Sequence, residues 1–302
     1  MNRRLLLYAA AFMAPLLIGA AAAQAADKIK VAASFSVLGD MANRIGGDRV
    51  ELTSFVGPNG DAHVYEPKPG DARTLADSAI LVVNGLGLEG WMSRLEKSSG
   101  FKGQVVTATK GIKTRQMVEE EHGQTRKITD PHGWQSLANG RVYVQNIRDG
   151  LIAADPAGKE TYEGNAKKFL AEIDTVEKDV KASIAKLPPA RRKIITTHDA
   201  FGYFGATYGM EFIAPAGVST DSEASARDVA KIIRQIKAEK IPAVFLENVT
   251  DHRLLDQIAK ETGAKIGGTL YSDALSDAKG PAATYLDMFR HNIQTLTAAL
   301  SS

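Results

Sequence analysis

Short apolar runs alternate with stretches of helical periodicity in the first half of the chain. The runs predict strands over residues 29–33, 52–55 and 80–83. Apolar residues at helical spacing predict a helix over residues 37–45, directly after the first strand. Alternation of strands and helices is typical of parallel sheets covered by helices. The first half of the chain is therefore predicted to form an α/β lobe.

A long amphipathic helix is predicted over residues 159–186. Apolar residues recur there at steps of three or four, at Phe169, Ile173, Val176, Val180 and Ile184. Pro188 and Pro189 follow, and proline cannot continue a helix. The periodic stretch should therefore end at this pair.

The same alternation begins again after the two prolines. Further strands are predicted over residues 193–197, 243–246 and 264–270, and further helices over residues 254–261 and about 282–300. Another helix should begin after Ser225, because Asp228 stands three residues later, as in a capping box. We expect a first lobe over residues 26–158, a connecting helix over 159–187 and a second lobe over 188–302.

The N-terminus has the features of a signal peptide. Arg3 and Arg4 precede an apolar stretch over residues 5–23, and Ala23 and Ala25 provide the small residues that signal peptidase reads. We expect residues 1–25 to be removed and the protein to work in the periplasm. A retained membrane anchor is the alternative, since the stretch is nearly long enough to span a bilayer.

Charge and cysteine content limit the partners of the mature chain. Removal of residues 1–25 leaves 35 basic and 35 acidic residues, so no net charge attracts nucleic acid or a lipid surface. The chain has no cysteine, which excludes disulfides and a lipid-modified N-terminal cysteine. A soluble monomer with no direct membrane anchor is expected.

Four candidate metal ligands lie far apart in the chain: His63, His132, His198 and Asp273. Intervals of 66 to 75 residues separate them, which excludes a local zinc-finger clip. Each stands in a turn or at the end of a predicted strand, where ligand sites form in open α/β sheets. One such histidine is usually an ordinary polar residue, but the set of four favours a metal site between two lobes.

The donor set favours Zn²⁺ as the ion. Three imidazoles and one carboxylate suit four-coordinate zinc, whereas Mn²⁺ prefers more oxygen ligands. Manganese or iron is the alternative cargo. A secreted zinc hydrolase is the alternative class of protein, but catalytic zinc needs an open coordination position, and these four groups can close a tetrahedron. We expect no enzymatic activity.

A glycine-rich segment over residues 85–90 matches the dinucleotide-binding pattern GxGxxG in form. No acidic residue closes the next predicted strand, near residues 105–109, where a ribose would require one. We interpret the glycines as allowing a tight turn between a strand and a helix.

Five segments carry a family resemblance: GDAHVYEPKPGD (60–71), NGLGLEGW (84–91), DPHGW (130–134), THDAFGYF (197–204) and LYSDALS (270–276). They resemble, in order, segments of the cluster A-I solute-binding proteins of zinc and manganese ABC transporters. The resemblance implies two Rossmann-like lobes bridged by one long rigid helix, with the metal between them. The family's four ligand positions fall on His63, His132, His198 and Asp273. It also implies delivery of the metal to a membrane permease of an ABC importer.

The chain departs from the zinc members of that family in one segment. Many of them carry a histidine-rich loop before the second ligand, whereas residues 119–126 here form an acidic stretch whose single histidine is His122. Manganese members often carry glutamate at the position of His198, and the histidine here favours zinc. We assign His252 and His291 to surface or packing roles.

Overall fold

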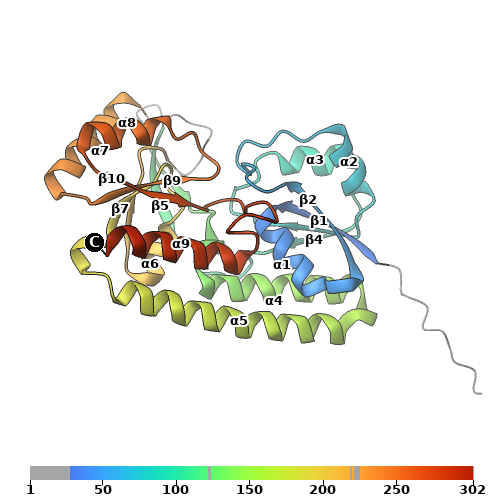
Figure 1. Cartoon of the computed structure of the whole chain (residues 1–302). Helices are drawn as coiled ribbons and strands as arrows, with labels where there is room; N and C mark the ends of the chain where they lie inside the picture. The colour runs from blue at the N-terminus through green and yellow to red at the C-terminus, as the bar shows by residue number, and fades with distance from the viewer. Residues whose placement is uncertain (1–27, 122–123, 218–219, 221–224, 302) are drawn as a thin grey trace, which may run out of the picture.

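The computed structural model describes residues 28–121, 124–217, 220 and 225–301 (Figure 1). The expected signal peptide, its cleavage site and His122 lie outside these residues. Two lobes stand side by side above a pair of long helices, and each lobe has its own parallel sheet (Figure 1). The predicted α/β architecture is confirmed. None of the described helices is long and apolar enough to span a membrane.

The first lobe contains a four-stranded parallel sheet in the order β2-β1-β3-β4. Its strands are β1 (Ile29–Phe35), β2 (Val50–Val56), β3 (Ile80–Val83) and β4 (Gln104–Thr107). Its helices are α1 (Ser36–Gly46), α2 (Pro69–Ala76) and α3 (Met92–Ser99). The elements predicted at residues 29–33, 37–45, 52–55 and 80–83 are all present, three of them extended by one or two residues at an end.

The second lobe repeats this design with the strand order β10-β9-β7-β8. Its strands are β7 (Lys193–Ile195), β8 (Glu211–Ile213), β9 (Ala243–Glu247) and β10 (Lys265–Leu270). Its helices are α6 (Gly202–Tyr208), α7 (Ala226–Glu239), α8 (Arg253–Thr262) and α9 (Tyr285–Leu300). The Ser225 side chain caps α7 by accepting a hydrogen bond from Asp228 N, as its spacing predicted.

Two boundaries in this lobe differ from the prediction. Strand β7 ends at Ile195 instead of residue 197, because the backbone N–H groups of Thr197 and His198 donate to the Glu247 carboxylate. Helix α9 begins at Tyr285 instead of about residue 282, because Thr284 caps it by accepting from Asp287 N. Side-chain hydrogen bonds fix both boundaries.

The long helix α5 (Lys159–Ala185) has 27 residues and runs beneath both lobes, beside α4 (Leu137–Ala154) (Figure 1). All five apolar positions of its predicted stripe are buried. Helix α5 packs against α1, α4 and α9, so it contacts elements from both halves of the chain. The connecting helix is confirmed almost residue for residue.

The acidic run at residues 119–121 belongs to a strand of an antiparallel pair, which the sequence analysis did not predict. The two strands are β5 (Gln116–Glu121) and β6 (Gln124–Thr129), and Glu119 pairs in register with Arg126. The acidic run obscured the strand, because charged residues are rare in buried strands and this pair lies outside both main sheets.

The hydrophobic core is divided unequally. The larger cluster spans both lobes: it includes the first lobe, the buried face of α5, residues of α9 such as Tyr285, and second-sheet residues such as Phe245 and Leu270. A smaller, separate cluster lies between the second sheet and its outer helices, with Ile195, Val244 and Ile258 among its members. Helix α9 packs on β10 and α5 and joins the core that both lobes share.

Candidate metal centre

The four residues singled out from the sequence converge between the lobes. One ligand atom from each of His63, His132, His198 and Asp273 lies within 4.8 Å of the others. His63 Nε2 is 3.2 Å from His132 Nε2 and 3.2 Å from Asp273 Oδ2. His198 Nε2 is 3.0 Å from Asp273 Oδ2. Four donor groups thus point toward one small volume.

The site is almost completely shielded from water. His132, His198 and Asp273 are fully buried, and the His63 side chain is only 5% exposed. A buried carboxylate is costly unless it is paired or bound to a metal. Asp273 Oδ1 is buried and has no hydrogen-bond partner, so it is available to a cation. Three imidazole nitrogens and one carboxylate form a donor set that suits a divalent transition metal.

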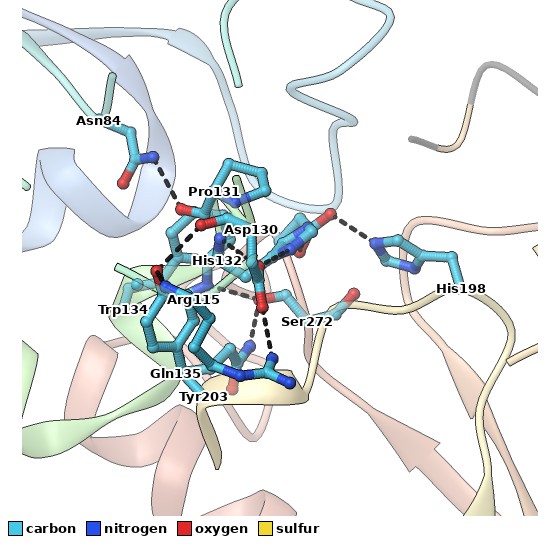
Figure 2. A network of polar contacts seen from close by, with 12 residues as sticks. Asn84, Arg115, Asp130, Pro131, His132, Trp134, Gln135, His198, Tyr203 and Ser272 are labelled. Carbon is cyan, nitrogen blue, oxygen red and sulfur yellow. Dashed lines mark hydrogen bonds and ion pairs between the residues drawn. The ribbon is translucent and has the colours of Figure 1, made fainter. Parts of the chain in front are cut away.

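His132 is oriented by a chain of polar contacts (Figure 2). Its Nδ1 lies 2.9 Å from Asp130 Oδ1, which also accepts a hydrogen bond from His132 N. Arg115 Nη1 donates to Asp130 Oδ2 at 2.7 Å. A carboxylate behind one ring nitrogen leaves the other free for a metal. The arginine needs a glycine at position 202, where a Cβ atom would lie 1.5 Å from Arg115 Nη1.

His198 has a carboxylate behind it as well. Its Nδ1 lies 2.7 Å from Glu247 Oε2, while Glu247 Oε1 accepts from the backbone N–H groups of Thr197 and His198. His63 is held through its backbone N–H, which donates to Asp61 Oδ1 at 2.9 Å. The sequence analysis did not single out Glu247, Asp130 or Arg115 for the site. Glu247 did carry a signal, since it is an acidic residue at the carboxyl end of a buried strand.

Burial and the carboxylates act in opposite directions on the imidazoles. Burial lowers the pKa of His132, but the nearby Asp273 and Asp130 carboxylates raise it to about 9. Burial likewise opposes Glu247 and Asp273 at His198, whose pKa lies well above its usual value. Burial raises the pKa of Asp273, but His198 and His132 hold it well below its usual range. The metal-free site therefore holds protons that an incoming cation must displace.

The glycine-rich segment is a structural turn, as interpreted. Gly85 and Gly87 have φ angles of 83° and 87°, which favour glycine. The turn closes on its own half-buried Glu89, whose carboxylate accepts hydrogen bonds from Asn84 N at 2.6 Å and Gly85 N at 3.1 Å. A side-chain carboxylate thus occupies the N–H groups to which a dinucleotide phosphate would bind.

Comparison with known families decides the class of the protein. The family model "Zinc-uptake complex component A periplasmic", ZnuA, matches residues 31–299. The chain belongs to the ZnuA family. The resemblance to cluster A-I solute-binding proteins is thereby confirmed, and the chain is a metal-binding component of an ABC importer that works outside the cytoplasm. ZnuA-family proteins are solute-binding transport proteins, so the hydrolase alternative is excluded.

Relatives of this ZnuA-family protein differ in the metal for which they are named. The manganese-binding lipoprotein MntA of Halalkalibacterium halodurans is 32% identical over 275 residues, covering 91% of this chain and 89% of MntA. The iron-binding protein YfeA of Yersinia pestis is 32% identical over 272 residues, covering 90% of this chain and 86% of YfeA. Relatives at similar distance therefore carry different cargo names.

Solved structures agree with the two-lobed fold. The periplasmic zinc-binding protein TroA of Treponema pallidum superimposes with a TM-score of 0.84 at 30% identity, covering 90% of this chain and 99% of TroA. A manganese-bound periplasmic metal-binding protein of Candidatus Liberibacter asiaticus superimposes with a TM-score of 0.80 at 31% identity, covering 90% of this chain and all of that protein. One fold thus serves zinc-named and manganese-bound relatives.

Proposed function

We propose that this protein captures Zn²⁺ with His63, His132, His198 and Asp273 and delivers it to the membrane permease of an ABC importer. The observation that carries the proposal is the convergence of four donor atoms within 4.8 Å in a buried site. These groups can close a tetrahedron without water, as a carrier requires, and they leave no open position for catalysis.

The donor set supports zinc over manganese. Three nitrogen donors and one oxygen suit zinc, and the general affinity order of divalent ions also places zinc above manganese. Manganese or iron is the alternative cargo, which relatives named for those metals support. Glu247 adds weight to this alternative, because it brings a second negative charge next to a ligand.

We propose that residues 26–158 and 188–302 act as two metal-binding lobes joined by the helical connection at 159–187. Residues 1–25 would be removed after Ala25, releasing the protein into the periplasm. MntA is named a lipoprotein, whereas this chain has no cysteine that could carry a lipid. We propose that the protein diffuses freely as a monomer without a lipid anchor.

Metal analysis of the natively exported protein tests the proposed cargo. The protein should be purified from the periplasm without added metal, and its metals quantified per chain. We expect about one zinc per chain. A manganese or iron content near one would establish the alternative cargo, and a chain without metal that also fails to bind added zinc would refute a carrier role.

Zinc affinity should still increase with pH above ~6.5, the pKa of an ordinary imidazole. Because the carboxylates raise the pKa of His132 to about 9, a proton must leave this ring when metal binds at neutral pH. We expect zinc affinity to rise by about tenfold per pH unit for each displaced proton, up to about pH 9. Competition titrations at several pH values measure this slope. A plateau already at ~6.5, the value of an ordinary imidazole, would contradict the pKa shift.

Removal of residues 119–126 should leave equilibrium affinity nearly unchanged. The four ligands lie outside β5 and β6, whereas Arg115 and Asp130, which flank the two strands, orient His132. We expect a variant in which a short turn replaces residues 119–126 to bind zinc within about tenfold of wild type, or ~1.4 kcal/mol. The capture rate from a metal donor should be measured in parallel. A large loss of equilibrium affinity would place a ligand in the deleted segment.

A further inference from the structure

Asp273 is fastened to the first lobe, although it follows the last strand of the second sheet. The carbonyl of the preceding residue, Ser272, accepts two hydrogen bonds from first-lobe side chains. Trp134 Nε1 donates at 2.9 Å and Gln135 Nε2 at 2.7 Å (Figure 2). Both donors are buried, so water does not compete for the carbonyl.

Further contacts join the same segment to the first lobe. Leu275 N donates to Ser36 Oγ at 3.0 Å, and Asn59 N donates to the Leu275 carbonyl at 2.9 Å. Helix α9 continues this attachment, because Tyr285 N donates to Asp40 Oδ2 at 2.9 Å. Residues 272–285 are thus bonded to the first lobe on both sides of Asp273.

His198 is attached differently. Its backbone and ring contact Glu247 at the end of β9, within the second sheet. The neighbouring strand residues Ile195 and Val244 belong to the separate core cluster of the second lobe. His198 and Glu247 therefore form one unit with the second sheet. The Asp273 segment is bonded to both lobes, because Asn248 after β9 also donates to the Ala274 carbonyl and accepts from Ser272 N.

We infer that Gln135 and Trp134 are positioning residues that set the place of Asp273 relative to His132. Trp134 stands two residues and Gln135 three residues after His132, on one short helical turn, Gly133–Gln135. This turn therefore fixes the distance between the second imidazole and the carboxylate. His63 and His132 then come from the first lobe, His198 comes from the second sheet, and Asp273 stands in a segment bonded to both lobes. The inference rests on the proposed metal site and explains which residues set the position of its carboxylate ligand.

The inference predicts a selective effect on metal preference. Asp273 is the oxygen donor among the four ligands, and manganese depends on oxygen donors more than zinc does. Loss of the groups that orient a ligand typically lowers metal affinity by about 10- to 100-fold. Misplacing the carboxylate should therefore weaken manganese binding more than zinc binding. A general loosening of the fold would weaken both alike.

The test uses Gln135→Met and Trp134→Phe, alone and combined. Methionine has a similar volume to glutamine and removes the Nε2 donor to the Ser272 carbonyl. It breaks no other hydrogen bond of the side-chain amide, because Gln135 Oε1 has no hydrogen-bond partner. Phenylalanine keeps a ring beside Phe35 and removes the indole donor. Asn139→Ala is the matched control, because Asn139 donates to the Gly133 carbonyl of the same turn and not to Ser272. Zinc and manganese affinities are measured for each variant at one pH.

We expect the double variant to lose about tenfold or more in manganese affinity and less than about threefold in zinc affinity. The Asn139→Ala control should keep the wild-type ratio. Unchanged affinities, or equal losses for both metals, would overturn the inference. If the double variant does not fold, Gln135→Met alone should shift the ratio in the same direction. Wild type and His198→Ala are titrated with zinc and manganese in the same series. A wild type that binds neither metal would refute the proposed function, and not only the inference about Gln135 and Trp134.

Discussion

Replacement of His132 or His198 by alanine is expected to lower zinc affinity by at least about a hundredfold, or ~2.7 kcal/mol. Each substitution removes one of four donors. It also leaves a buried carboxylate, Asp130 or Glu247, without its imidazole partner. His63→Ala should also cause a large loss, whereas Asp273→Ala should cause a smaller one, because water can occupy the vacated oxygen position.

Competition against a chromophoric chelator measures these affinities. His252→Ala is the matched control, since His252 is exposed at the start of α8 and should leave affinity unchanged. The unfolding temperature of each metal-free variant shows whether the fold is retained. If all three ligand-histidine variants bind zinc like wild type, the proposed site is wrong.

The second large effect is expected from His198→Glu, which should shift preference from zinc toward manganese. The substitution replaces a nitrogen donor with a harder oxygen donor and raises the number of anionic ligands from one to two. The structure adds a complication, because Glu247 Oε2 lies 2.7 Å from His198 Nδ1. A new carboxylate at this position would meet Glu247 directly, and two buried like charges repel.

We therefore expect the single variant to lose affinity for both metals, while its zinc-to-manganese affinity ratio falls by about tenfold. Adding Glu247→Gln should restore much of the manganese affinity, because the amide removes the repulsion. Glu247→Gln alone is the control, and it should weaken both metals. A ratio that stays constant or rises in the double variant would show that residue 198 does not set metal preference.

Much of this fold could be predicted from local patterns. The apolar stripe of α5 and the cap at Ser225 lie within single elements, where periodicity and spacing are sufficient evidence. The end of β7 could not be predicted, because it depends on a hydrogen bond to Glu247, some 50 residues away. The antiparallel strands β5 and β6 were missed because they carry charged residues in place of an apolar run.

The four candidate ligands could be singled out from the sequence, but the residues that orient them could not. His63, His132, His198 and Asp273 stand in segments that carry the family resemblance, and the structure brings them together. The partners that orient them become neighbours only after folding. The attachment of Asp273 to the first lobe was equally hidden, because sequence order assigns it to the second. The identity of the metal could not be predicted from the sequence for another reason: one donor set can bind several divalent ions.

Anomalous diffraction from crystals of the zinc-loaded protein tests the central claim most directly. Data collected on both sides of the zinc absorption edge locate the ion independently of any assumption about ligands. The account predicts one strong peak between the lobes, about 2.0–2.2 Å from Nε2 of the three histidines and from a carboxylate oxygen of Asp273. A zinc peak elsewhere, with this cluster empty, would contradict it.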